Sequence, residues 1–254
     1  MRFDDVAAAV AGVPNMDPNQ GWGVYEHLRR TGATQVLEIG TAHGVSAAYM
    51  AAALEENGGG KVTTVDGAEP TQHRDPAPGA VLERAGLSSL VDRVLVGDSS
   101  YTWWLKQKVQ ERSDDQGNCA PLYDFCYLDG AHNWTIDGLS VILVEKLLNE
   151  GGWLLLDDLN WSYADSSSSF GDGQGPGDLG LSESELAEPH VAAVYDLLVR
   201  QHPSFSEFRI ENGDWGWARK LAGGSRELRQ EETALPVGQR LRVAARKVGG
   251  SRRD

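Results

Sequence analysis

Four side chains in two short segments have the types and spacing needed to bind a metal ion and move a proton. The first segment, YLDGAHNW, contains Asp129 and His132, and the second, LLLDDLNW, contains Asp157 and Asp158. Both follow apolar runs typical of buried parallel strands, whose carboxyl ends meet at one edge of a sheet. Carboxylates gathered there repel one another unless a cation lies among them, and oxygen ligands suit Mg²⁺, Ca²⁺ or Mn²⁺. The sequence therefore predicts a divalent metal site made by Asp129, Asp157 and Asp158.

His132 is the candidate catalytic base. Its ordinary pKa lies near neutrality, so it can take a proton from a hydroxyl that a metal ion has made more acidic. The alternative is structural: His132 enters a helix and bonds backbone, while the aspartates cap a helix, contact a cofactor or accept hydrogen bonds from loop amides. Trp134, Trp161 and Tyr163 follow the same strand ends. These aromatic side chains form either the wall of a substrate pocket or ordinary packing.

A third segment, VLEIGTAHGVS at residues 36–46, has the pattern of a ligand-binding turn. An acidic residue stands near the end of a buried strand, two glycines follow, and a helix then begins. Glycines at the carboxyl end of a strand let the backbone approach a bound nucleotide closely. A dinucleotide fingerprint has three glycines as G-x-G-x-x-G, whereas Ala42 stands in the second position here. This spacing argues against an NAD-dependent dehydrogenase.

The pattern E-I-G-T-x-x-G-x-S after a strand resembles the first motif of class I S-adenosylmethionine (SAM)-dependent methyltransferases. Acidic residues follow the next strands in that family's order. The resemblance implies that Asp66 bonds the ribose, that Asp98 lies near the adenine, and that Glu38 is a positioning residue. The full set of SAM-binding residues that it implies is Glu38, Gly40, Thr41, Ala42, Gly44, Ser46, Asp66, Gly67, Asp98, Ser99 and Asp129. Without a cofactor, the same glycines and acids would serve turns and helix caps.

The combination of D-x-x-H with D-D resembles metal-dependent small-molecule O-methyltransferases, notably those acting on macrolide sugars and more distantly the catechol type. In those enzymes the carboxylates match Asp129, Asp157 and Asp158, and the base of the sugar enzymes matches His132. The catechol type carries a lysine nearby instead. The resemblance implies methyl transfer from SAM to a hydroxyl of a secondary metabolite with help from Mg²⁺. Two alternatives stay open: a metal-free N- or C-methyltransferase, and a non-catalytic protein that binds SAM or a nucleotide.

The elements that must position these residues form an α/β pattern, because short β-type runs alternate with longer amphipathic ones. We expect a Rossmann-like, doubly wound and mostly parallel seven-stranded sheet with an antiparallel C-terminal hairpin strand. A single helix is predicted over residues 182–202, with Ser182 and Glu185 in capping-box spacing. The predicted strands are 35–39, 61–65, 93–96, 123–128, 152–156, 205–211 and 215–220, and the other predicted helices are 46–57, 80–85, 101–112 and 135–149.

The domain expected at residues 1–220 is a SAM-dependent methyltransferase domain, with an N-terminal helical cap over about 1–33. Residues 221–254 form a locally basic tail, and the Ser/Gly/Asp-rich segment 166–180 is a candidate lid. A formal charge of −14 repels nucleic acid and anionic membranes, so a small molecule is the expected substrate. We further expect a cytoplasmic protein that could form homo-oligomers.

Overall fold

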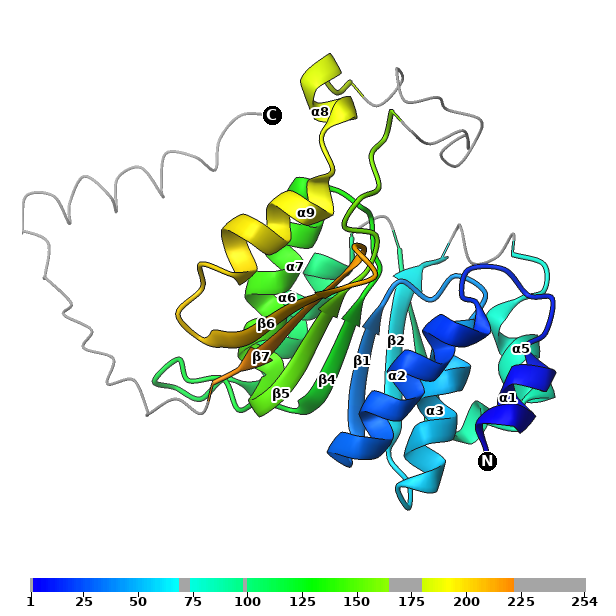
Figure 1. Cartoon of the computed structure of the whole chain (residues 1–254). Helices are drawn as coiled ribbons and strands as arrows, with labels where there is room; N and C mark the ends of the chain where they lie inside the picture. The colour runs from blue at the N-terminus through cyan, green and yellow to red at the C-terminus, as the bar shows by residue number, and fades with distance from the viewer. Residues whose placement is uncertain (1, 69–73, 98–99, 165–179, 222–254) are drawn as a thin grey trace, which may run out of the picture. The chain divides into compact units, whose positions relative to one another are not determined.

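The computed structural model describes residues 2–68, 74–97, 100–164 and 180–221, and a seven-stranded sheet runs through this part of the chain (Figure 1). The strand order is β3-β2-β1-β4-β5-β7-β6. Strands β1 to β5 pair in parallel, and β7 is antiparallel to both β5 and β6. The predicted Rossmann-like fold with an antiparallel hairpin strand is confirmed. The strands are β1 (Gln35–Ile39), β2 (Lys61–Gly67), β3 (Val91–Val96), β4 (Tyr123–Leu128), β5 (Leu148–Leu156), β6 (Phe205–Glu211) and β7 (Trp215–Lys220).

Helices cover both faces of the sheet. The helices α1, α2, α3 and α5 lie on one face, and α6, α7 and α9 lie on the other (Figure 1). Buried side chains form two clusters to match, because neighbouring strand residues point to opposite faces: Val36 belongs to the first cluster and Leu37 to the second. The described helices are α1 (Phe3–Ala9), α2 (Pro18–Thr31), α3 (Val45–Glu56), α5 (Pro78–Arg84), α6 (Tyr101–Arg112), α7 (Trp134–Leu147), α8 (Glu183–Ala187) and α9 (His190–Val194), with a 3₁₀ turn at Ser88–Leu90 and a π-helical turn at Tyr195–Val199.

Helix α3 is the main support of the turn that follows β1. Its residues 47–54 are all buried, and five of them are alanines, which let it pack closely against α2 and β2. The approach is closest at Gly21, where an added Cβ would lie 2.4 Å from the Tyr49 ring. This packing fixes the amino end of α3 at the edge of the sheet that carries the candidate site.

The expectation of one helix over residues 182–202 is wrong. The capping box at Ser182 and Glu185 starts α8 as predicted, but the helix ends at Ala187. Pro189 disfavours helical backbone at Glu188, which is extended with a ψ of 133°, and α9 begins only after the proline. The result is a broken segment of α8, α9 and a π-helical turn, and not a single rod.

The predicted boundary between the last interior helix and β5 is also wrong. The helix predicted over 135–149 ends at Leu147, and β5 begins at Leu148 and contains both Gly151 and Gly152. Gly151 has a φ of 76°, and the pairing of β5 with β4 changes register nearby, so these glycines serve an irregular strand. The predicted strands 205–211 and 215–220 are β6 and β7, and the turn between them contains Asn212 and Gly213, both with positive φ.

Several sequence predictions fall outside the described residues: Asp98, Ser99, most of the candidate lid and nearly all of the basic tail. Cys126 is buried in β4, and both it and Cys119 are free thiols. None of the helices in the described ranges has the length and apolar character needed to cross a membrane.

Candidate active site

The sheet continues past its strand ends and brings the predicted acids to one edge. The Asp129 amide donates to the carbonyl of Ile39 over 2.9 Å, and the Asp157 amide donates to the carbonyl of Leu128 over 3.0 Å. These bonds extend the ladders between β1, β4 and β5 by one residue. Asp129, Asp157 and Asp158 therefore emerge side by side at the carboxyl edge, as parallel strands require.

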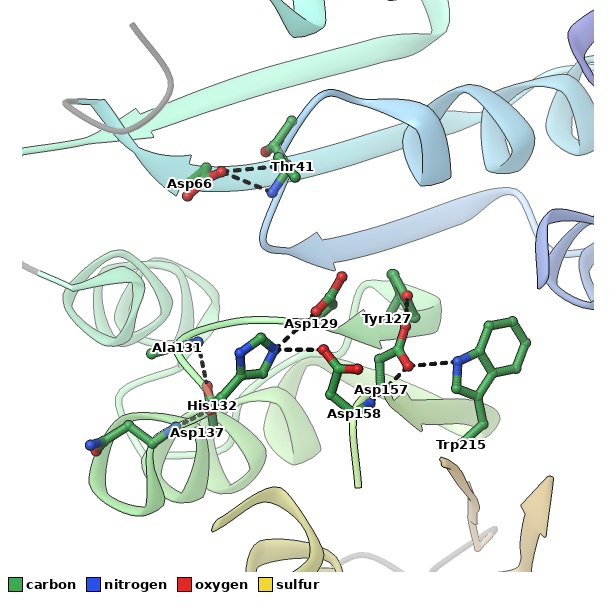
Figure 2. A network of polar contacts seen from close by, with 12 residues as sticks. Thr41, Asp66, Tyr127, Asp129, Ala131, His132, Asp137, Asp157, Asp158 and Trp215 are labelled. Carbon is green, nitrogen blue, oxygen red and sulfur yellow. Dashed lines mark hydrogen bonds and ion pairs between the residues drawn. The ribbon is translucent and has the colours of Figure 1, made fainter. Parts of the chain in front are cut away.

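His132 lies between two of these carboxylates. Its Nε2 is 3.2 Å from Asp129 Oδ1 and 3.1 Å from Asp158 Oδ2, so one ring nitrogen faces both (Figure 2). Burial disfavours charge on the ring, but hydrogen bonds and ion pairs with Asp129 and Asp158 outweigh it and raise the pKa of His132 to about 10. With these partners alone, the imidazole is charged at neutral pH.

The loop that carries His132 is held by a buried carboxylate that the sequence analysis missed. Asp137, in the first turn of α7, accepts hydrogen bonds from the amides of Asn133 (2.8 Å) and Ala131 (3.3 Å) on either side of the histidine. Asn133 caps the helix by accepting from the Thr135 amide over 2.9 Å. Asp137 could have been found from sequence. Asn133 is a typical helix cap, and an acidic residue four positions later lies in the first turn of the helix, where it can accept hydrogen bonds from amides of the preceding loop.

Three candidate site residues have backbones in the left-handed region that favours glycine. They are Ala42 (φ 43°), His132 (φ 51°) and Asp158 (φ 58°). Such backbones persist in residues other than glycine only when their surroundings hold them in place, and they concentrate at functional sites. Their occurrence in the turns after β1, β4 and β5 supports a functional role for this edge of the sheet.

Asp157 differs from the other two acids because it is buried and both of its oxygens are bonded. Its Oδ1 accepts from the indole Nε1 of Trp215 and from the Asp158 amide, each over 2.7 Å, and its Oδ2 accepts from the Tyr127 hydroxyl (Figure 2). Burial, together with the charge of Asp129, raises the pKa of Asp157. Neither Tyr127 nor Trp215 was identified from sequence. Tyr127 had a weak sequence signal, because it lies in β4 two residues before Asp129 and so on the same side of the strand. Trp215 had none, because its position depends on how β7 pairs with β5.

The acids form two overlapping groups that could hold a cation. Among the described residues, Asp129, His132 and Asp158 offer ligand atoms within 4.8 Å of one another, and so do Asp157, Asp158 and Asp214. Asp158 belongs to both groups, so the predicted trio shares one edge without forming a single compact group. Carboxylate oxygens dominate both groups, and such a donor set fits a hard divalent ion.

The turn after β1 is tied to the ends of its neighbouring strands. The amides of Thr41 and Ala42 each donate to Asp66 Oδ2 over 3.1 Å, and the second oxygen of Asp66 accepts from the Gly67 amide over 2.7 Å. Gly40 has a φ of 94°, and an added Cβ would lie only 1.8 Å from the carbonyl oxygen of Asp129. The predicted cofactor turn and the predicted catalytic loop are therefore in direct contact.

Glu38 and Ser46 bond to each other beneath this turn. The Ser46 hydroxyl donates to Glu38 Oε1, while Glu38 Oε2 is buried without a hydrogen-bond partner within the described residues. Burial raises the pKa of Glu38 to about 8, and the charges of Asp129 and Asp66 act in the same direction. Gly44 caps α3 without a side chain, so the first amides of that helix face the same edge. An anionic or polar ligand group fits this position.

Of the three predicted aromatic residues, Trp161 lies beside His132 and Tyr163 lies beside Trp161. The Trp161 ring is 4.9 Å from the His132 ring and 4.8 Å from the Tyr163 ring, measured between centroids. The Tyr163 hydroxyl donates to the carbonyl of Ala131 over 3.2 Å. Trp134 instead begins α7, is 40% exposed and lines a separate cleft of about 260 Å³ against α8 and α9.

A mostly parallel sheet of this order, with a glycine turn after β1 and acids at the following strand ends, defines a Rossmann-like fold, and proteins of this fold bind ligands at the carboxyl edge of the sheet. Residues 37–159 match the family model described as a methyltransferase domain. No curated protein sequence matches the chain. The family match over residues 37–159 agrees with the methyltransferase resemblance of the chain's motifs.

Solved structures share this fold at low sequence identity. An O-methyltransferase from Bacillus cereus in complex with SAH is 21% identical, with 85% of this chain and 88% of that chain covered and a TM-score of 0.55. The O-methyltransferase TomG from Streptomyces achromogenes, involved in tomaymycin synthesis and in complex with SAM, is 16% identical, with 87% and 89% covered and a TM-score of 0.54. An SAH-bound methyltransferase from Podospora anserina is 14% identical, with 85% and 86% covered and a TM-score of 0.56.

Proposed function

We propose that the protein transfers a methyl group from SAM to a hydroxyl of a small molecule, with assistance from a divalent metal ion and with His132 as the base. The single observation that carries this proposal is the position of His132. Its Nε2 lies within 3.2 Å of carboxylates from two strand ends, at the edge where the glycine turn meets β4. An acid-base side chain, candidate metal ligands and a candidate cofactor turn thus share one small region.

The residues of the turn after β1 fit SAM. Helix α3 has no side-chain cap, so the amides at its start suit the carboxylate of the methionine part of SAM, and the absence of a side chain at Gly40 leaves room for close approach. Asp66 accepts two backbone bonds on one oxygen and one on the other, so its carboxylate keeps one of about four acceptor positions for a ribose hydroxyl. SAM supplies an electrophilic methyl group on a positively charged sulfur.

The carboxylates Asp129, Asp157 and Asp158 are the proposed metal ligands, with Mg²⁺ as the expected ion. A bound divalent ion lowers the pKa of a hydroxyl that it coordinates. The same charge would take the place of the imidazolium as the partner of Asp129 and Asp158. His132 would then be free to accept the proton of the acceptor hydroxyl at Nε2.

Trp161 and Tyr163 are the proposed wall of the acceptor site, because the Trp161 ring lies against the His132 ring. Flat aromatic surfaces bind sugar or phenol rings with little loss of side-chain entropy. TomG, which has the same fold, is involved in tomaymycin synthesis. We therefore propose a hydroxylated secondary metabolite as the substrate class.

Isothermal titration of SAM and of Mg²⁺ tests the first half of this proposal. Wild type is expected to bind SAM with and without EDTA and to bind Mg²⁺, whereas Asp158→Ala is expected to bind SAM only. A panel of hydroxylated acceptors with radiolabelled SAM then tests turnover and its loss on chelation. Turnover that survives EDTA would favour a metal-free methyltransferase, and SAM binding without turnover on any acceptor class would favour a non-catalytic binding protein.

A further inference from the structure

Asp157 is connected to two large side chains that come from different strands and that have no assigned role. Tyr127 in β4 donates its hydroxyl to Oδ2, and Trp215 at the start of β7 donates its indole Nε1 to Oδ1 over 2.7 Å. All three residues are buried, with exposed fractions of 0% for Tyr127, 4% for Trp215 and 6% for Asp157. Both oxygens of the carboxylate are thereby fixed in direction (Figure 2).

Trp215 is itself held from two sides. Its ring packs on α2, where a Cβ added at Gly23 would lie 3.2 Å from it. The residue before it, Asp214, accepts hydrogen bonds from the amides of Leu159 and Asn160, each over 3.0 Å. The β6–β7 turn is thus hydrogen-bonded to Leu159 and Asn160, which directly follow Asp158. Through these contacts, the C-terminal hairpin sets the position of both adjacent acids.

An ionised carboxylate has about four acceptor positions, so the three donors leave Asp157 able to bind a cation while preventing its rotation. Donors that orient a metal-binding side chain raise metal affinity, because the ligand no longer loses freedom on binding, and their removal costs about 10- to 100-fold. The buried tryptophan indole would otherwise need a different partner.

We infer that Tyr127 and Trp215 are positioning residues that hold Asp157 ready for a divalent cation, so that the antiparallel hairpin is part of the metal site. This inference rests on the proposed function, since it requires the metal. It extends that proposal to side chains on the face of the sheet covered by α2.

The experiment measures binding of Mn²⁺ by isothermal titration to the full chain in the presence of SAM, together with thermal unfolding. The variants are Tyr127→Phe and Trp215→Phe, which remove the donors and keep an aromatic ring at each position. The matched control is Trp217→Phe in the same strand, because Trp217 is equally buried and its Nε1 has no hydrogen-bond partner within the described residues.

Tyr127→Phe and Trp215→Phe are each expected to raise the Kd for Mn²⁺ by about 10-fold or more, while Trp217→Phe changes it less than about twofold. Unchanged Kd values in both donor variants would overturn the inference and leave the proposed metal site standing. An equal loss in all three variants would mean general loosening of the strand and would also overturn it. If wild type itself takes up no Mn²⁺, the metal-dependent function fails along with the inference, and this outcome is recognised without any variant.

Discussion

Replacing Gly40 by alanine tests whether the cofactor turn and the catalytic loop depend on the same space. A Cβ at this position would lie 1.8 Å from the Asp129 carbonyl oxygen and 2.8 Å from its carbonyl carbon. Both contacts are with backbone, so the ends of β1 and β4 must separate by roughly 1.5 Å to reach ordinary contact. Overpacking of this kind costs about 1–3 kcal/mol, and the φ of 94° adds about 1–2 kcal/mol of backbone strain for alanine.

The matched control is Gly58→Ala, because Gly58 has a similar φ of 99° and an added Cβ there meets nothing within 4 Å. It isolates the backbone strain of about 1–2 kcal/mol. Urea unfolding should therefore show a larger loss of stability for Gly40→Ala than for Gly58→Ala, by about 1–3 kcal/mol. Titration with SAM should show a Kd raised by about tenfold or more only in Gly40→Ala, since a displacement near 1 Å spoils a preorganised site. Equal stability of the two variants, with wild-type SAM binding in both, would refute the reasoning.

Three further predictions concern single side chains of the site. Because Glu38 has an ordinary pKa of 4.5 and a pKa of about 8 when folded, wild type should lose stability between those pH values, by up to about 1.4 kcal/mol per pH unit. Glu38→Gln should lack this loss in urea unfolding at pH 5 and pH 8, and parallel curves for the two proteins would contradict it. His132→Ala should lower kcat by about 10²- to 10⁴-fold with little change in the Kd for SAM, and an unchanged kcat would exclude the base role. Trp161→Ala should raise KM for the acceptor about 3- to 10-fold at constant SAM affinity, whereas a matching rise in the Kd for SAM would assign the ring to the cofactor side.

The interior strands were predictable because parallel strands that are covered on both faces consist of continuous runs of apolar residues. The runs before Glu38, Asp129 and Asp157 needed no tertiary information, and the shared direction of the strands then placed these acids at one edge. The break at Pro189 was also visible in the sequence, because proline disfavours helical backbone at the residue before it. The capping box at Ser182 drew attention to the start of that helix and away from its end.

The directions in which the individual carboxylates point could not be predicted from the sequence. Asp157 and Asp158 are neighbours in the chain, yet one faces Trp215 and the other faces His132. That difference arises from the register of β5 with β7 and from the left-handed backbone at Asp158, and neither is encoded in a local pattern. Sequence motifs locate the edge of the sheet, whereas tertiary pairing decides which carboxylate points where.

The negative charge at this edge of the sheet favours a cationic ligand such as SAM over an anionic dinucleotide. Glu38, Asp66, Asp129, Asp157 and Asp158 gather at the edge of the sheet that carries His132. Burial raises the pKa values of Glu38, Asp129 and Asp157 above those of ordinary carboxyls, and the charges of neighbouring acids add to the effect. A dinucleotide would bring an anionic pyrophosphate close to these acids, and the repulsion would weaken its binding. The missing second glycine also removes the space that lets the backbone approach a pyrophosphate. SAM carries a sulfonium and an ammonium group against one carboxylate, and a divalent metal would bring two further positive charges. The charge of the site thus supports the same assignment as the glycine spacing, although the two rest on different physical grounds.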